Sequence, residues 1–220
     1  MRNLNQLIIK FDYDQNFRDD DYYVSSSNKH IFTLLNQWPR WDKNFLNIHG
    51  EKYSGKTHLI NIFIKKFKGM KFDANSLTDN DLKTIKLHEN IILENFNENI
   101  NEKLIYSLLN IIDLDNKFII ITSERSIVDM TFSLNDLNSR INSFLIQKIE
   151  KPDDELMFAL ILKYLSDRQI SIDKKLINFI IKRIDRSYGK IFDFIYKVDE
   201  LSLKRKKPID FKIIKDVLGE

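Results

Sequence analysis

The sequence predicts an α/β domain built on a parallel β-sheet, followed by a small domain made only of helices. Short apolar runs typical of buried strands alternate with amphipathic helical patterns as far as about residue 150. Beyond that point only helical spacing of apolar residues remains. Strands that alternate with helices form parallel sheets covered on both faces, and such sheets bind ligands at the carboxyl ends of their strands.

The α/β part is predicted to begin with a strand at 45–48 and a glycine-containing loop. A helix follows, in which the apolar residues Leu59, Ile60, Phe63 and Phe67 lie at helical spacing. Further strands are predicted at 70–73, 90–94, 117–122 and 144–149, with a helix at 103–112 before the fourth of them. Residues 12–23 are acidic and aromatic, and we expect them to link the first residues to the core.

The helical part is predicted to begin near residue 150. Pro152 and the three acidic residues after it are typical of the first turn of a helix. Apolar stripes follow at 156–164, 176–184 and 191–198, and a short last helix begins after Pro208. The expected organisation is an N-terminal peptide at 1–12, an α/β domain at 13–149 and a helical domain at 150–220.

The composition excludes several kinds of protein. The chain has no Cys, and its four His are scattered, which excludes disulfides and argues against a structural metal site. No apolar run is long enough to cross a bilayer and the first residues do not resemble a signal peptide, so we expect a cytoplasmic protein without a membrane partner. The net charge of only +3, from 35 basic and 32 acidic residues, lacks the basic excess of an autonomous DNA-binding domain.

Residues 50–57 match the phosphate-loop pattern G-x-x-x-x-G-K-S/T without a mismatch. The glycines let successive backbone N–H groups face phosphate oxygens, and the following helix adds its positive end. Lys56 would neutralise the β- and γ-phosphates, and the Thr57 hydroxyl would bind Mg²⁺. We therefore expect ATP or ADP with Mg²⁺, rather than a simple turn before a core helix. The predicted contacts are Gly50, Glu51, Lys52, Tyr53, Ser54, Gly55, Lys56, Thr57 and His58.

Three further residues are candidates for the chemistry of hydrolysis. Glu94 ends the strand at 90–94 and would help to hold Mg²⁺, unless it is a solvent-facing acid. The following Asn95 cannot accept a proton, so we expect binding rather than rapid hydrolysis. Ser123 follows the strand at 117–122, where it can touch the γ-phosphate or the attacking water, or serve as a turn residue. Arg140 is a surface charge or an arginine finger that reaches the nucleotide of a neighbouring subunit.

Taken together, these residues resemble the AAA+ ATPases, and more narrowly their DnaA-related, Hda-like members, over nearly the whole chain. The resemblance implies a three-layer AAA+ sandwich whose helical tail is a lid that closes over the nucleotide. Residues 23–28 resemble the segment that packs on the adenine, which adds Val24 and Asn28 to the nucleotide contacts; Asn28 can also be a plain helix N-cap. Residues 134–140 are similar to the arginine-finger motif, with Arg140 at the finger position.

The sequence departs from this family in the lid. The arginine that senses the γ-phosphate is expected near 186–190, and the closest register places Gly189 there. Lys190 follows one residue later and is the basic side chain that we predict to contact the nucleotide. The printed sequence ends at Glu220, after the lid helices, where DnaA continues into a helix-turn-helix domain. We therefore expect contact with DNA to be indirect.

The first residues resemble the peptide by which replication proteins bind the sliding clamp. Gln6, Leu7, Ile9 and Phe11 are the predicted clamp contacts, and Lys10 replaces the usual Pro. The alternation of Leu7, Ile9 and Phe11 is equally compatible with an edge strand on the core.

The resemblance implies a negative regulator of replication initiation that is tethered to the sliding clamp. It would present Arg140 in trans to ATP bound by the initiator DnaA, so that hydrolysis occurs on the partner. One alternative is an autonomous, ring-forming ATPase or DnaC-like loader that uses its own ATP. Another is a membrane- or DNA-associated adaptor in which the fold is only a binding module. The sequence leaves open whether the working ligand is ADP or ATP and whether the chain forms homo-oligomers.

Overall fold

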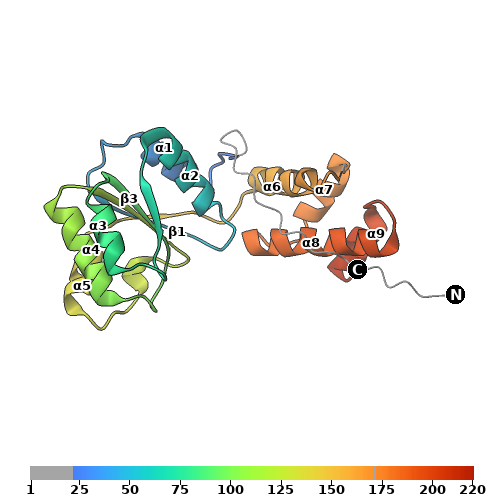
Figure 1. Ribbon diagram of the computed structural model, residues 1–220. Coiled ribbons are helices and arrows are strands. Elements are labelled where there is room, and N and C mark those ends of the chain that lie inside the picture. Colours follow the sequence, from blue (N-terminus) through green and yellow to red (C-terminus); the bar gives the residue numbers. More distant parts are fainter. Residues whose placement is uncertain (1–21, 171) are drawn as a thin grey trace.

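The computed structural model describes residues 22–170 and 172–220 of the 220-residue chain. These residues form an α/β lobe and a helical lobe that lie side by side (Figure 1). The peptide at 1–12, with the predicted clamp contacts Gln6, Leu7, Ile9 and Phe11, lies outside the described residues.

Within the described residues, the α/β lobe is built on one five-stranded sheet in which every neighbouring pair of strands is parallel. The strands lie in the order β2-β3-β4-β1-β5, so β4 separates β1 from β3. This order confirms the predicted parallel sheet and brings the carboxyl ends of β1, β3 and β4 to one edge, where ligands of such sheets bind. The strands are β1 (Phe45–His49), β2 (Met70–Asp73), β3 (Asn90–Phe96), β4 (Phe118–Ser123) and β5 (Leu145–Lys148).

Helices cover both faces of the sheet, which completes the three predicted layers (Figure 1). Alternate residues of the central strands face opposite ways: Ile91 and Leu93 pack under α3, α4 and α5, whereas Ile92 and Ile120 pack under α1 and α2. The helices are α1 (Lys29–Asn36), α2 (Lys56–Phe67), α3 (Asp79–Ile85), α4 (Glu102–Leu114) and α5 (Asn135–Ile141), with a short 3-10 helix, η2 (Ile127–Asp129).

Helix α3 is absent from the sequence prediction. It has only seven residues, of which Leu82 and Ile85 are apolar, so a helical period is hard to recognise. A capping box between Thr78 and Asp81 closes its first turn, and this is the local signal that indicates the helix.

The helical lobe has its own apolar core, which buries the predicted stripes of three successive helices. Each of its helices begins at a residue whose side chain accepts a hydrogen bond from a backbone amide of the first turn; these residues are Asp153, Asp173, Ser187 and Asp210. The helices are α6 (Asp154–Asp167), α7 (Lys174–Ile181), α8 (Tyr188–Arg205) and α9 (Phe211–Leu218). Leu156 and Tyr188 also pack against the core of the α/β lobe, which joins the two lobes.

Candidate nucleotide-binding site

The phosphate loop connects β1 with α2, in the place that the sequence predicts. The Gly50 amide donates to the carbonyl oxygen of Ser123 at 3.2 Å, and a Cβ on Gly50 would lie 3.0 Å from the Cβ of Ile149. Gly55 has a φ of +89°, a conformation that side chains disfavour. Glycine is therefore favoured at position 55 by the backbone conformation of the loop, and at position 50 by the close approach of Ile149.

Lys56 places its ammonium group inside the loop. Its Nζ donates to the carbonyl oxygens of Gly50 at 2.6 Å and Glu51 at 3.0 Å. Burial lowers the pKa of Lys56, and the carboxylates of Glu124, Glu51 and Glu94 oppose that change. A partly buried cation held by carbonyl oxygens is well placed to bind an anion, because phosphate oxygens can replace those carbonyls.

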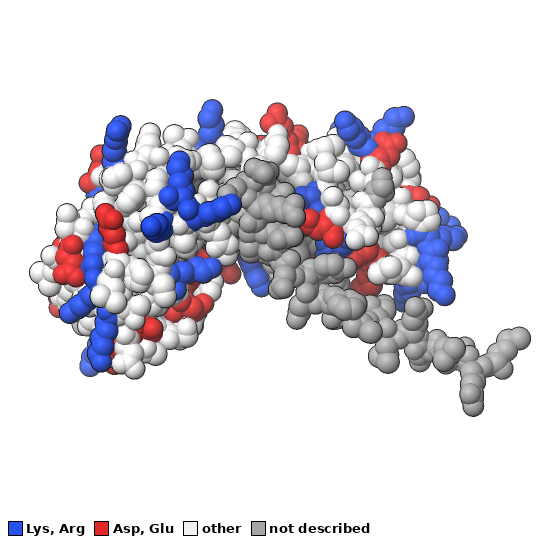
Figure 2. Space-filling view, turned by 45° about the horizontal axis from the view of Figure 1, so that its top comes forward, with Lys and Arg blue, Asp and Glu red and all other residues white. Residues whose placement is uncertain are grey.

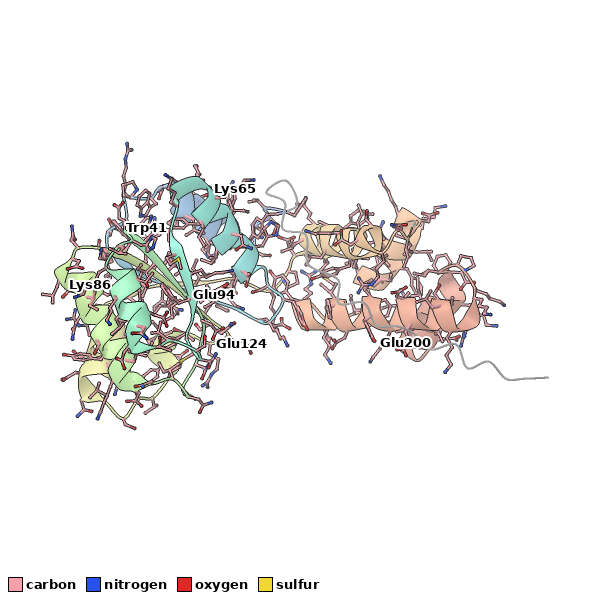
Figure 3. All side chains as sticks on the ribbon, viewed as in Figure 1. Trp41, Lys65, Lys86, Glu94, Glu124 and Glu200 are labelled. Carbon is pink, nitrogen blue, oxygen red and sulfur yellow. The ribbon has the colours of Figure 1, made fainter. Side chains whose placement is uncertain are left out.

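The loop opens onto a cleft of about 2230 Å³ between the two lobes. Glu94 and Glu124 lie on the side of the α/β lobe that is nearest to the helical lobe, and Lys86 lies on the opposite side (Figure 3). Of the predicted site residues, Val24, Asn28, residues 52–58 and Ser123 line the cleft. The lining residues do not include Gly50, Glu51, Glu94, Arg140 or Lys190.

Tyr22 and Asn28 shape the wall of the cleft next to α1. The Tyr22 ring stacks on Phe32, with 6.0 Å between ring centroids, and meets His58 edge-on at 5.2 Å. Tyr22 is thus packed into the core rather than part of a linker, and burial raises the pKa of its hydroxyl. Asn28 is at the N-cap of α1, but its side chain bonds back to the Ser25 amide and the Tyr23 carbonyl oxygen instead of capping the helix.

Two buried hydroxyl groups on the cleft have no hydrogen-bond partner among the described residues. They are the Tyr22 hydroxyl and the Ser54 Oγ within the phosphate loop. Buried polar groups are nearly always paired, so unpaired hydroxyls on a cleft indicate a polar ligand. A nucleotide fits this requirement, since its phosphates and base offer acceptors.

Glu94 is the last of five consecutive buried residues in β3 and is not a solvent-facing acid, because only 8% of it is exposed. One carboxylate oxygen is 3.1 Å from the Lys71 Nζ, and the other is buried without a partner among the described residues. Thr57 lies exposed in the first turn of α2. A carboxylate and a hydroxyl suit Mg²⁺ that is held mainly by phosphates and water. The described residues contain no cluster of three or more His, Cys, Asp or Glu that could hold a metal ion.

Asn95 stands where a proton acceptor would follow Glu94. Its φ is +60°, and its side-chain amide donates to a carboxylate oxygen of Asp73 at the end of β2. This hydrogen bond is the main cause that lowers the pKa of Asp73. Asn95 is therefore bonded to the neighbouring strand and supplies no base to an attacking water.

Ser123 is 2% exposed and its hydroxyl is committed to other protein groups. It donates to the Arg125 carbonyl oxygen at 2.6 Å and accepts from the Asn47 side chain at 2.9 Å. Asn47 is fully buried in β1, where it also donates to the Ile121 carbonyl oxygen and accepts from the Ile127 amide. Asn47 is not among the predicted site residues, although a lone Asn in an apolar strand is itself a signal, since buried amides need partners.

Arg140 lies on α5, away from the cleft lining, with 28% of its side chain exposed. Its Nη1 donates to an Asp113 carboxylate oxygen at 2.7 Å and its Nη2 to the Asn110 Oδ1 at 2.6 Å. Both partners are on α4. The guanidinium is therefore held in a defined orientation at the surface rather than free in solvent.

Acidic and basic side chains are interspersed over most of the surface shown in Figure 2. The basic run at 204–207 is exposed at the carboxyl end of α8, and Arg205 pairs with Asp216 of α9. Among the described residues, every helix is too short or too polar to span a bilayer.

Comparison with known proteins gives relatives of low identity, and no protein-family model matches the chain. An uncharacterized protein of Haemophilus influenzae is 24% identical over 188 residues, which cover 80% of this chain and 81% of that protein. The chromosomal replication initiator protein DnaA of Thermoanaerobacter sp. is 26% identical over 227 residues and 91% of this chain. The chain spans about half (51%) of that DnaA protein's length.

Solved structures decide the fold. Domain III of the Thermotoga maritima replication initiation protein DnaA superposes with a TM-score of 0.69 at 17% identity, covering 94% of this chain and 97% of that one. The chain has a DnaA-like AAA+ fold. DnaA bound to AMPPCP and single-stranded DNA gives a TM-score of 0.64 at 17% identity, over 88% of this chain and 69% of that one. The RuvB branch migration motor of Thermotoga maritima gives 0.63 at 16%, over 89% and 69%. The DnaA-like AAA+ fold thus includes the helical lobe, which we call the lid.

Proposed function

We propose that the chain binds an adenine nucleotide in the cleft between the α/β lobe and the lid, and that it regulates the initiation of DNA replication. The observation that carries the binding proposal is the complete phosphate loop between β1 and α2, with Lys56 held inside it by two carbonyl oxygens. The similarity to replication initiators, one of them bound to AMPPCP, supports adenine as the base and replication as the process.

The binding proposal is tested by the affinity of the purified chain for ADP and for ATP with and without Mg²⁺. Lys56→Ala removes the cation that faces the phosphates, and we expect it to weaken binding more than tenfold, or about 1.4 kcal/mol. Lys66→Ala is the matched control, because Lys66 ends the same helix and bonds to Asn36 away from the cleft. Equal affinities of the two variants would contradict the proposal.

The regulatory proposal is that Arg140 acts on ATP bound by a DnaA initiator. The chain itself is poorly equipped to hydrolyse ATP, since Asn95 is bonded to Asp73 and supplies no base. Arg140 lies outside the chain's own cleft but is held at the surface by Asp113 and Asn110. A guanidinium presented to a neighbouring nucleotide stabilises the charge that develops on the transferred phosphoryl group. In this proposal the peptide at 6–11 tethers the chain to the sliding clamp.

The test is ATP turnover by a purified DnaA initiator to which this chain and DNA-loaded clamp are added. We expect stimulation that is lost in Arg140→Ala and Gln6→Ala. Arg140→Lys is also expected to fail, because an ammonium group cannot reproduce the planar, two-pronged geometry. Arg183→Ala is the matched control, since Arg183 is a surface residue paired with Glu220 at the far end of the lid. Full stimulation by Arg140→Ala would refute the mechanism.

An autonomous ATPase is the second candidate. It is favoured by the fit of Thr57 and the unpaired oxygen of Glu94 to Mg²⁺. The same assay distinguishes the two functions when the initiator is omitted. Substantial turnover by this chain alone, lost in Glu94→Gln, would favour the autonomous enzyme over the regulator.

A further inference from the structure

The phosphate loop contacts the lid directly through Glu51. The Glu51 carboxylate reaches the start of α8, where it accepts hydrogen bonds from the Ser187 hydroxyl and from the backbone amides of Tyr188 and Gly189, both at 3.1 Å. These residues are more than 130 positions apart in the sequence. The contact therefore joins the two lobes at the residue that follows the first glycine of the loop.

Glu51 completes the hydrogen bonding at the start of an 18-residue helix. The first four amides of a helix have no partner within it. In α8 the Ser187 amide bonds to the Asp185 carbonyl oxygen and the Lys190 amide bonds to the Ser187 hydroxyl. Intrahelical bonding begins only with the Ile191 amide, which donates to the Ser187 carbonyl oxygen. The two amides that remain, those of Tyr188 and Gly189, donate their hydrogen bonds to the Glu51 carboxylate. The negative charge of Glu51 also suits the positive end of the helix.

Gly189 is the residue that lets Glu51 approach. A Cβ at this position would lie 3.1 Å from the nearer carboxylate oxygen of Glu51. The sequence analysis places Gly189 at the position where the related proteins have a γ-phosphate-sensing arginine. A side chain there would crowd the carboxylate, so the contact of Glu51 with α8 depends on glycine at position 189.

A second contact between the loop and α8 lies one turn further along the helix. The Tyr53 ring stacks on Phe192, with 4.3 Å between centroids and 11° between planes, and Tyr164 of α6 meets the same ring edge-on at 5.7 Å. Offset stacking of this kind adds to the apolar contact that the rings make. The loop is thus held to the lid by a polar and an aromatic contact.

We propose that Glu51 is a positioning residue that fastens the lid to the phosphate loop, so that the lid is held over the cleft without a γ-phosphate-sensing arginine. The fastening is a property of the chain alone. Only its effect on nucleotide release rests on the proposed function. Loss of the Glu51 carboxylate frees the start of α8 and lets the lid open, which speeds the escape of a bound nucleotide.

The first experiment measures hydrogen exchange of the Tyr188 and Gly189 amides by NMR in the nucleotide-free chain. We expect exchange at least tenfold faster in Glu51→Ala, because both amides lose their acceptor. Glu124→Ala is the matched control: it removes a carboxylate that also acts on Lys56 but has no bond to α8, so these amides should keep their protection. Unchanged exchange in Glu51→Ala would overturn the proposal.

A double-mutant cycle with Gly189→Ala separates this role from general stability. Alanine favours helices more than glycine, so Gly189→Ala should slow exchange at the start of α8 when Glu51 is already Ala. In the wild-type chain the same substitution should speed exchange, because the new Cβ crowds the carboxylate. Slower exchange in both backgrounds would show that Glu51 does not occupy this position, and the proposal would be wrong.

A second experiment measures the dissociation rate of a fluorescent ADP analogue from the four proteins of the cycle. These are the wild-type chain, Glu51→Ala, Gly189→Ala and the double variant. We expect at least threefold faster release from Glu51→Ala and from Gly189→Ala, and no further increase in the double variant. Exchange effects without any binding by the wild-type chain would refute the proposed function and leave the fastening intact. Binding with equal release rates from all four proteins would refute its effect on nucleotide release.

Discussion

Asn47 is the buried polar residue whose replacement should reveal most about the α/β lobe. Its side chain makes three hydrogen bonds, to the Ile121 carbonyl oxygen, the Ser123 hydroxyl and the Ile127 amide, at 3.1, 2.9 and 3.3 Å. At about 1 kcal/mol for each bond, Asn47→Ala should lose about 3 kcal/mol of unfolding free energy. Asn47→Asp should lose more, because an ionised carboxylate would be buried against a carbonyl oxygen that cannot donate to it.

Urea denaturation followed by tryptophan fluorescence is the appropriate assay. Both Trp of the chain, Trp38 and Trp41, pack against Phe63 and Phe118 within the α/β lobe, so fluorescence reports this lobe and not the lid. With a urea dependence of about 2 kcal/mol/M, the midpoint of Asn47→Ala should fall by about 1.5 M. Lowering the pH should narrow the deficit of Asn47→Asp, since a protonated carboxyl is neutral and can donate.

Asn44→Ala is the matched control, because Asn44 lies just before β1 and makes one exposed hydrogen bond to Asn116. Its midpoint should change by less than about 0.3 M. The reasoning fails if Asn47→Asp is as stable as Asn47→Ala at neutral pH, or if Asn47→Ala and Asn44→Ala shift the midpoint equally.

Three further predictions concern the cleft and its borders. Gly55→Ala should destabilise the chain by about 1–2 kcal/mol and weaken nucleotide binding. The φ of +89° disfavours a side chain at this position, and a Cβ would lie 3.2 Å from the Tyr22 ring. A urea denaturation midpoint equal to that of the wild type would contradict this prediction. Partial burial tends to raise the pKa of Asp153, but hydrogen bonds from Ser26 and from the α6 amide lower it to about 2 from 3.8. The ionised Asp153 should therefore stabilise the folded chain fully above about pH 4, and this stabilisation should disappear as the pH falls towards 2. Thermal denaturation should show this loss in the wild-type chain and not in Asp153→Asn. Asn95→Asp should lower the melting temperature at neutral pH through repulsion from Asp73, and the deficit should shrink in acid; an unchanged melting temperature would mean that the two side chains are not in contact.

The elements with a clear period were predictable from the sequence. The strand at 70–73 has the predicted bounds, and the helix at 103–112 agrees with α4 to within two residues. The apolar residues from Leu59 to Phe67, predicted to lie on a helix, fall within α2. The phosphate loop was predictable because its glycines and Lys56 form a dense local pattern. The lid was predictable because its four helices bury regular apolar stripes and begin at capping residues.

The remaining features depend on residues that are distant in the sequence. Nothing local to Glu51 indicates that its carboxylate bonds to α8, and nothing local to Arg140 indicates its partners on α4. Tyr22 appeared to belong to an acidic linker because its contacts, Phe32 and His58, come later in the chain. The order of the strands also depends on distant residues. The apolar runs indicate that strands exist, whereas tertiary packing determines which strands are neighbours.

The strand order also sets the sequence of events during synthesis. Among the strands that the structure describes, β1 leaves the ribosome first, yet both of its neighbours, β4 and β5, come at least 69 residues later. Until they emerge, both edges of an apolar strand are open to incorrect pairing with other chains. Newly made chains stopped before residue 118 should therefore be captured by chaperones more often than those stopped after residue 150. The phosphate loop takes its final form only near the end of translation of the α/β lobe.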